Sequence, residues 1–101
     1  MKGVAILGAT GSIGRSALAV LARHPERFRV VALTAHRNAE ALGALAREWS
    51  PSLVSLGEGT GEAGWERGRE GLLAAATHPE ADIVLNAIVG AAGLEATLAA
   101  L

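Results

Sequence analysis

Short, almost wholly apolar runs alternate along the chain with segments whose apolar residues recur at helical spacing. The apolar runs lie at residues 4–7, 28–35, 52–56 and 82–87. Such runs, bounded by turn residues, are typical of strands that are covered on both faces of a parallel sheet. The segments between them predict helices, so the expected order of elements is β-α-β-α-β-α-β-α.

Capping and helix-breaking residues delimit the predicted helices. The first is expected over residues 12–23 with Ser12 as its N-cap, and the second follows the capping residue Asn38 and ends at residues 50–51. Helices are also expected over 69–77 and 94–101, whereas the Gly- and Glu-rich residues 57–68 predict mostly loop. The residues expected to face the core are Ile13, Ala17, Val20 and Leu21 in the first helix, Leu42, Leu45, Ala46 and Trp49 in the second, Leu72, Leu73 and Ala76 in the third, and Leu94, Leu98 and Leu101 in the last.

This alternation determines the predicted fold class. Strands joined through helices are parallel, so the first two strands are expected to be neighbours in an open sheet with helices on both faces. The fold is therefore α/β, a Rossmann-like doubly wound parallel sheet, in a single domain over residues 1–101. Because the last predicted helix stops at Leu101 without a cap or a polar tail, we expect the fold to be truncated at its C-terminus.

Composition narrows the classes of function. Apolar residues make up 50% of the 101 residues but aromatic residues only 3%, and the net charge is -1. The scattered Lys and Arg residues form no basic patch, which argues against nucleic acid or an acidic membrane as partner. No apolar run approaches the ~20 residues of a membrane helix. The absence of cysteine, and a start without the pattern of a signal peptide, favour a cytoplasmic protein.

The turn after the first apolar run is glycine-rich. Gly8, Gly11 and Gly14 follow a predicted strand and open a predicted helix, which is the context of a dinucleotide-binding turn. Such a turn directs backbone N–H groups and a helix N-terminus toward one point that suits a phosphate. Thr10 and Ser12 add hydroxyl groups beside these amides. The alternative is a tight turn with only a structural role.

The residues after the second strand indicate which dinucleotide would bind. NAD sites usually carry an acidic residue about 20 residues beyond the glycines, to accept a hydrogen bond from the ribose 2′-hydroxyl. Here that region contains His36, Arg37 and Asn38 and no acidic residue. Arg37 can pair with a 2′-phosphate, so NADP(H) is the better fit. In the alternative interpretation Arg37 is a solvated surface charge and Asn38 only a helix cap.

Residues that could perform catalysis are not evident. The three histidines lie far apart in sequence and two of them precede proline, so metal ligation is not predicted, and Glu58, Glu62, Glu66 and Glu70 are expected to form a solvated face. We therefore predict no catalytic and no metal-binding residue in this chain. A second glycine-containing stretch, residues 86–93, follows the fourth predicted strand, where small residues would leave room for a coenzyme or allow close helix packing.

Several motifs in register resemble one known family. They are Ile6-Leu7-Gly8-Ala9-Thr10-Gly11-Ser12-Ile13-Gly14, then Phe28-Arg29-Val30-Val31-Ala32-Leu33, then Arg37-Asn38, and finally Asn86-Ala87-Ile88-Val89-Gly90-Ala91-Ala92-Gly93-Leu94 before Thr97-Leu98-Ala99-Ala100. Together they resemble the N-terminal domain of 1-deoxy-D-xylulose-5-phosphate reductoisomerase across the whole chain. The Ile-Val-Gly-Ala-Ala-Gly-Leu stretch is the more specific motif, because the glycine turn occurs in many coenzyme-binding proteins.

The resemblance implies a function. Enzymes of this family isomerise and reduce 1-deoxy-D-xylulose 5-phosphate to 2-C-methyl-D-erythritol 4-phosphate in isoprenoid precursor biosynthesis, using NADPH and a divalent metal (Mg or Mn), usually as cytoplasmic homodimers. It also implies that Thr10, Gly11, Ser12, Ile13, Arg37 and Asn38 contact the coenzyme. The predicted cofactor-binding set adds Gly8, Gly14 and His36 from the same two segments. His36 stands where the family commonly has glycine. The metal and substrate residues would lie beyond residue 101, so this chain alone is expected to be inactive. Two other functions remain open from the sequence: a stand-alone NADP-sensing regulatory domain, and the first domain of another NADP-dependent dehydrogenase.

Overall fold

The fold is a parallel sheet with helices on both faces, as the alternating pattern predicts. The computed structural model describes residues 1–88, 96 and 98–100. In chain order the elements are β1 (Lys2–Leu7), α1 (Ser12–Leu21), β2 (Phe28–Ala35), α2 (Ala39–Trp49), β3 (Leu53–Leu56), β4 (Glu66–Arg67), α3 (Gly68–Ala76) and β5 (Ile83–Asn86). Ala96 and residues 98–100 are also helical. The predicted stretch at residues 89–93 lies outside the described residues, as do Leu94 and Leu101.

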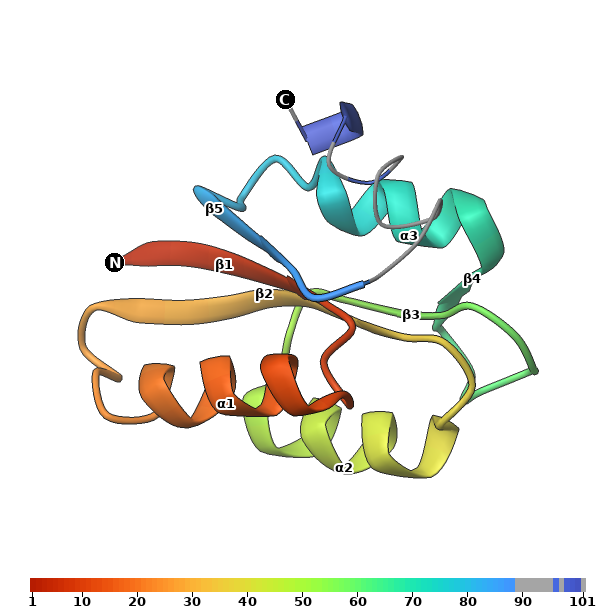
Figure 1. The fold of residues 1–101 in the computed structure, drawn as a ribbon, viewed down its shortest axis with the longest axis horizontal. Coiled ribbons are helices and arrows are strands. Elements are labelled where there is room, and N and C mark those ends of the chain that lie inside the picture. The colour runs from red at the N-terminus through yellow and green to blue at the C-terminus, as the bar shows by residue number, and fades with distance from the viewer. Residues whose placement is uncertain (89–95, 97, 101) are drawn as a thin grey trace.

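The sheet has the strand order β4-β3-β2-β1-β5, and all four neighbouring pairs are parallel. Figure 1 shows α1 and α2 on one face of the sheet and α3 with the C-terminal helical residues on the other. Each face has its own apolar core, in which Ile6 and Leu33 lie beneath α1 and α2, while Leu7 and Val31 lie on the side of α3. The carboxyl ends of β1, β2 and β3 therefore meet at one edge of the domain.

The prediction that residues 57–68 are mostly loop is confirmed, but the segment ends in a short strand that the sequence does not indicate. Glu66 and Arg67 form the two-residue strand β4, which pairs with Ser55 and Leu56 of β3, and α3 begins at Gly68. A two-residue strand is too short to show the alternation of apolar and polar residues from which strands are predicted. The remaining residues 57–65 connect β3 to β4 without a helix or a strand.

The predicted buried face of α1 is partly wrong. Ile13 is 67% exposed and Val20 is 54% exposed, whereas Gly14 and Leu18 are buried together with the predicted Leu21, and the predicted Ala17 packs against the core. Gly14 packs against Gly8 and Ala9 of the glycine turn so closely that a side chain there would collide with them, and this contact turns the Gly14 side of the helix inward. Apolar spacing alone does not reveal such a contact.

The other helices agree better with the pattern. Leu42 of α2 is fully buried, and Leu45, Ala46 and Trp49 pack against the same core. In α3 the predicted Ala76 is buried, Leu72 packs against its core and Leu73 is partly buried, but Gly71 and Ala75 are also buried. Leu98 is 63% exposed, so its predicted inward orientation is wrong.

The two predicted N-caps have different outcomes. The Asn38 side chain accepts a hydrogen bond from the Ala41 amide at 3.0 Å, which confirms it as the cap of α2. Ser12 is not a cap, because Gly11 occupies the N-cap position of α1 and Ser12 is the first helical residue. The extended backbone of Gly11 provides the change of direction from turn to helix.

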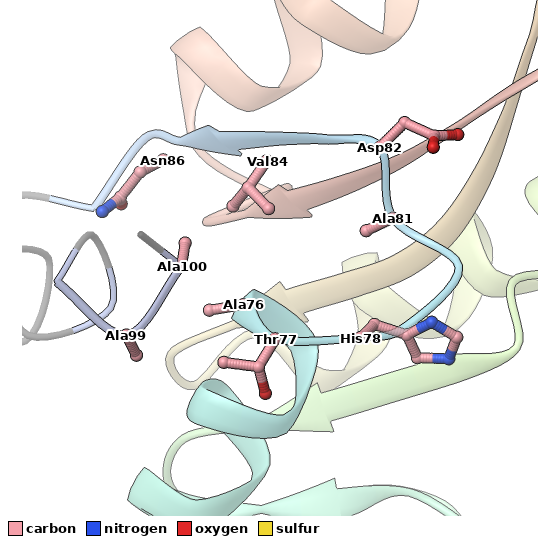
Figure 2. A pocket seen from close by; sticks show the side chains of 9 residues that line it. All are labelled: Ala76, Thr77, His78, Ala81, Asp82, Val84, Asn86, Ala99 and Ala100. Carbon is pink, nitrogen blue, oxygen red and sulfur yellow. The ribbon is translucent and has the colours of Figure 1, made fainter.

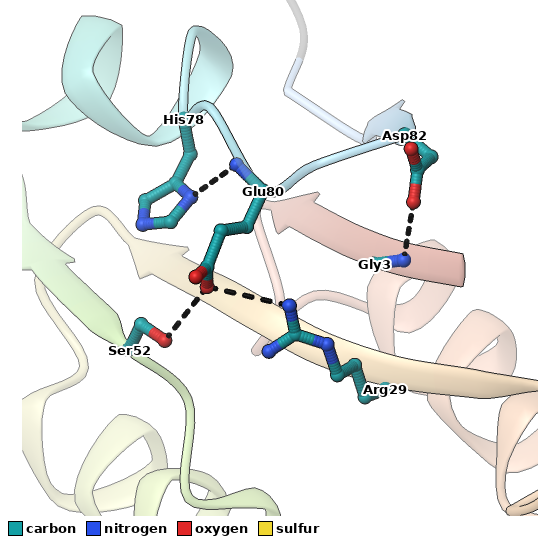
Figure 3. A network of polar contacts seen from close by, with 6 residues as sticks. All are labelled: Gly3, Arg29, Ser52, His78, Glu80 and Asp82. Atoms are coloured by element: carbon teal, nitrogen blue, oxygen red, sulfur yellow. Dashed lines mark hydrogen bonds and ion pairs between the residues drawn. The ribbon is translucent and has the colours of Figure 1, made fainter. Parts of the chain in front are cut away.

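Polar contacts join the amino ends of the strands, on the side of the sheet away from the glycine turn (Figure 3). The Asp82 carboxylate accepts a hydrogen bond from the Gly3 amide at 2.8 Å, and the Asp82 amide donates to the Gly3 carbonyl at 2.8 Å. The Glu80 carboxylate lies 3.4 Å from the Arg29 guanidinium and 3.5 Å from the Ser52 hydroxyl. These contacts tie the segment before β5 to the amino ends of β1 and β2 and to Ser52, the residue before β3.

Candidate functional site

The glycine turn between β1 and α1 is held by the end of β2. Gly8 has φ +82°, a left-handed conformation that favours glycine. Its amide donates a hydrogen bond to the Thr34 hydroxyl at 3.1 Å, and the Ala9 amide donates to the Thr34 carbonyl at 2.7 Å. A β-carbon at Gly14 would collide with the Gly8 carbonyl and the Ala9 backbone, so the first turn of α1 packs directly on the glycine turn. The N-terminus of α1 is thereby fixed beside the carboxyl ends of the strands.

A cavity of about 720 Å³ opens at this edge of the sheet. Its volume lies within the range of small-molecule and cofactor sites. The residues that line it come from the glycine turn (Gly8, Thr10, Gly11), the end of β2 (Thr34, Ala35, His36), the end of β3 (Ser55, Gly57, Glu58), the start of α3 (Gly68, Arg69, Leu72) and the segment after β5 (Ala87, Ile88). The carboxyl edge of a doubly wound sheet is where such folds bind their ligands.

The basic residues after β2 form an ion-pair cluster at this cavity. The Arg37 Nε atom lies 2.7 Å from one Glu58 carboxylate oxygen, and the His36 Nε2 atom lies 3.7 Å from the other. All three side chains are more than half exposed. Glu58, Glu62, Glu66 and Glu70 are all exposed, as the predicted solvated face requires. Two of them also form ion pairs, since Glu58 belongs to this cluster and Glu62 pairs with Arg47 at 3.3 Å.

The structure brings together only part of the predicted set. Gly8, Thr10, Gly11 and His36 line the cavity, and Arg37 adjoins it through its contact with Glu58. The remaining predicted residues, Ser12, Ile13, Gly14 and Asn38, are not among the cavity's lining residues.

The sequence does not indicate several residues of this site, and three of them bear on its geometry. The sequence pattern places Thr34 only in or next to a strand, whereas in the structure its hydroxyl accepts a hydrogen bond from the Gly8 amide. Ser55 is buried at the end of β3, where it contributes to the cavity wall. Glu58 lies in a segment without periodicity, and only the strand order β3-β2-β1 brings it beside Arg37. An acidic residue two positions after β3, combined with the placement of β3 beside β2, is the signal that could indicate it.

A second cavity, of about 560 Å³, lies between the end of α3, β5 and the C-terminal helical residues. Figure 2 shows its lining, which combines the apolar residues Ala76, Ala81, Val84, Ala99 and Ala100 with the polar residues Thr77, His78, Asp82 and Asn86. It contains neither the glycine turn nor a cation from the end of β2. We therefore place the candidate coenzyme site at the first cavity.

The described residues offer no metal centre and no membrane helix. No group of three or more His, Asp or Glu side chains within residues 1–88, 96 and 98–100 could hold a metal ion. Over the same part of the chain, no helix combines the length and the apolarity that crossing a membrane requires.

The strand order, the glycine turn and the cavity at the carboxyl edge define a Rossmann-like α/β domain of the nucleotide-binding class. The comparison with known families is more specific. A family model described as 1-deoxy-D-xylulose 5-phosphate reductoisomerase matches residues 4–101. The chain belongs to this family, which confirms the resemblance predicted from the sequence.

Individual relatives agree with this assignment. The chain is 50% identical to the 1-deoxy-D-xylulose 5-phosphate reductoisomerase of Symbiobacterium thermophilum, over 99% of this chain and 30% of the relative. It is 47% identical to the Ralstonia pickettii enzyme, over 99% of this chain and 28% of that relative. The chain thus spans less than a third of the length of these curated relatives.

Solved structures show the same fold. A crystal structure of DOX-P reductoisomerase in complex with NADPH, fosmidomycin and magnesium matches 99% of this chain and 28% of its own, with a TM-score of 0.88 and 41% identity. The Zymomonas mobilis 1-deoxy-D-xylulose 5-phosphate reductoisomerase in complex with NADPH matches 98% of this chain and 29% of its own, with a TM-score of 0.87 and 36% identity.

Proposed function

We propose that this chain, residues 1–101, is the NADPH-binding domain of a 1-deoxy-D-xylulose 5-phosphate reductoisomerase. The observation that carries the proposal is the position of the glycine turn, which the end of β2 holds at the mouth of the 720 Å³ cavity with Arg37 at the cavity's margin. Membership of the family and the NADPH complexes of two related structures support it. The whole enzyme would convert 1-deoxy-D-xylulose 5-phosphate to 2-C-methyl-D-erythritol 4-phosphate.

The residues present fit a dinucleotide. Gly8, Thr10 and Gly11 of the turn line one part of the cavity, which continues toward β2, β3 and α3, and the N-terminus of α1 follows directly after Gly11. We assign the pyrophosphate to the amides of Gly11, Ser12 and Ile13, where the helix dipole favours negative charge. Thr10 contributes a hydroxyl, while Gly8 and Gly14 supply the turn geometry and the close packing of α1.

The adenosine end of the coenzyme would lie toward β2. Arg37 is assigned to the 2′-phosphate, because a guanidinium forms charge-assisted hydrogen bonds with phosphate oxygens. His36 and Asn38 flank Arg37 and would contact the same ribose. When bound, NADPH supplies a hydride, and the role of this chain's residues is to bind and orient the coenzyme.

The catalytic and metal-binding residues are proposed to lie outside this chain. The described residues contain no metal-ligating cluster, and related structures that contain magnesium are more than three times as long as this chain. The divalent metal (Mg or Mn) therefore does not fit the residues present here, and no catalytic step is assigned to them. We accordingly propose that the 101-residue chain alone is inactive. On the separate ground of the family resemblance, we propose that the whole enzyme is a cytoplasmic homodimer.

Nuclear magnetic resonance tests the assigned site residue by residue, and a chain of 101 residues is small enough for this method. Adding NADPH to the ¹⁵N-labelled chain is expected to shift the amide resonances of residues 8–14 and 36–38. The amides of Gly3 and Asp82, at the opposite edge of the sheet, serve as the internal control and should not move. Shifts confined to the region of β5 and Thr77, or none at all, would contradict the proposal.

A further inference from the structure

Glu58 holds a carboxylate at the place assigned to the coenzyme's 2′ substituent. Its two oxygens lie 2.7 Å from Arg37 Nε and 3.7 Å from His36 Nε2, so the carboxylate bridges the two basic side chains. It also lines the 720 Å³ cavity together with His36. The acidic residue that is absent after β2 in the sequence is thus supplied, in space, by the end of β3.

The backbone fixes this arrangement. The Glu58 amide donates a hydrogen bond to the His36 carbonyl at 2.6 Å, and the preceding Gly57 amide donates to the Ala35 carbonyl at 2.9 Å. These bonds extend the pairing of β3 with β2 beyond the last sheet partners, Ala35 and Leu56. The backbone of Glu58 is therefore held beside His36, next to Arg37, so the carboxylate lies near Arg37 whatever the conformation of the Arg37 side chain.

We propose that Glu58 determines coenzyme selectivity: its carboxylate competes with a 2′-phosphate for Arg37 and thereby narrows the preference for NADPH over NADH. The inference rests on the proposed coenzyme site and goes beyond it by assigning a role to a residue outside the glycine turn and the 36–38 segment.

The two coenzymes interact with this carboxylate in opposite ways. A 2′-phosphate carries roughly two negative charges near neutral pH. It must either displace Glu58 from Arg37 or bind within a few ångströms of a second anion, and both routes reduce its affinity. NADH carries a 2′-hydroxyl instead, which can donate a hydrogen bond to the same carboxylate.

The size of the effect follows from the exposure of the pair. The Arg37 and Glu58 side chains are 72% and 55% exposed, so water screens their attraction. Replacing one such contact is expected to change affinity by about threefold to fivefold. Selectivity is the ratio of two dissociation constants measured on one protein, and a change of this size is readily resolved in that ratio.

The chain provides a matched control. Glu62 is 53% exposed and lies 3.3 Å from Arg47, which is 69% exposed, so this ion pair resembles the Glu58 pair in exposure. Neither Glu62 nor Arg47 lines the 720 Å³ cavity. Glu62→Gln therefore removes one negative charge from a similar ion pair outside the coenzyme site.

The test measures the dissociation constants of NADPH and NADH for the unsubstituted chain, Glu58→Gln and Glu62→Gln by isothermal titration calorimetry. The Gln side chain keeps the size of Glu and a hydrogen-bond acceptor but removes the charge. Glu58→Gln is expected to lower the NADPH dissociation constant by about threefold to fivefold and to leave the NADH dissociation constant nearly unchanged. Glu62→Gln is expected to leave both dissociation constants unchanged.

Two outcomes overturn the inference while leaving the proposed function intact. In the first, Glu58→Gln binds NADPH but its preference for NADPH over NADH is unchanged or smaller. In the second, Glu58→Gln and Glu62→Gln gain NADPH affinity equally, which would indicate a general charge effect. Failure of the unsubstituted chain and of both variants to bind NADPH would overturn the proposed function together with the inference. Thermal unfolding of each variant confirms that the compared proteins are folded.

Discussion

The Thr34 hydroxyl accepts a hydrogen bond from the Gly8 amide at 3.1 Å. The two residues lie at the carboxyl ends of neighbouring strands, β2 and β1, and Thr34 is only 3% exposed. The next amide, that of Ala9, donates to the Thr34 carbonyl at 2.7 Å. Through these two bonds, β2 determines the geometry of the glycine turn to which we assign the coenzyme's phosphates.

Thr34→Val is expected to reduce the free energy of unfolding by about 1–2 kcal/mol, because the shape of the side chain is kept while the acceptor for the Gly8 amide is lost. Urea denaturation measures this change. NADPH affinity should fall as well, since the turn loses one of its two hydrogen bonds to Thr34. Thr34→Ser, which keeps the hydroxyl, is the control and should retain the coenzyme affinity. Equal NADPH affinity in the Val and Ser variants would show that this hydrogen bond does not position the turn.

Gly14→Ala is expected to destabilise the domain by about 1–3 kcal/mol, because the new methyl group would collide with the backbone of Gly8 and Ala9. Gly11→Ala is the matched control. A β-carbon at Gly11 meets nothing closer than the Gly8 carbonyl oxygen at 3.7 Å, and the Gly11 backbone has φ -78°, which alanine adopts readily. Thermal unfolding should therefore show a large decrease in Tm for Gly14→Ala and a small one for Gly11→Ala. Similar decreases would contradict the close packing of α1 on the turn.

Asp82→Ala is expected to lower stability without changing coenzyme affinity. The substitution removes the acceptor of the Gly3 amide at the amino end of β1, a loss of about 1–2 kcal/mol. Because the glycine turn lies at the other end of the same strand, NADPH binding to the folded fraction should be unaltered. Urea denaturation combined with calorimetric titration separates the two quantities. A decrease in affinity larger than the unfolded fraction accounts for would contradict the separation of the two edges.

The sequence predicted the elements best where a single local signal was strong. Residues 28–35 are apolar almost throughout, and β2 has these bounds. Asn38 occupies its predicted capping position, and the parallel pairing of the first two strands is confirmed. The family resemblance was likewise visible in the sequence, because its motifs occur in register along the chain.

The incorrect predictions depended on contacts between distant segments. Ile13 and Val20 have helical spacing, yet α1 presents Gly14, Leu18 and Leu21 to the sheet, since the approach to Gly8 determines its orientation. β4 exists only through its pairing with β3. Glu58 meets Arg37 because β3 lies beside β2, which no local pattern reveals. The assignment of coenzyme contacts to residues 8–14 and 36–38 stays a prediction.

The central claim is that this domain binds NADPH through the glycine turn and Arg37. The most direct measurement is the ratio of the NADH and NADPH dissociation constants for the unsubstituted chain, Arg37→Ala and the control Arg47→Ala, which removes a similarly exposed arginine outside the cavity. We predict that the unsubstituted chain binds NADPH more tightly than NADH. Arg37→Ala is expected to weaken NADPH binding by about tenfold or more and to leave NADH binding unchanged, whereas Arg47→Ala is expected to change the affinity for neither coenzyme. Equal affinity of the unsubstituted chain for both coenzymes, or equal effects of the two arginine substitutions, would contradict this account.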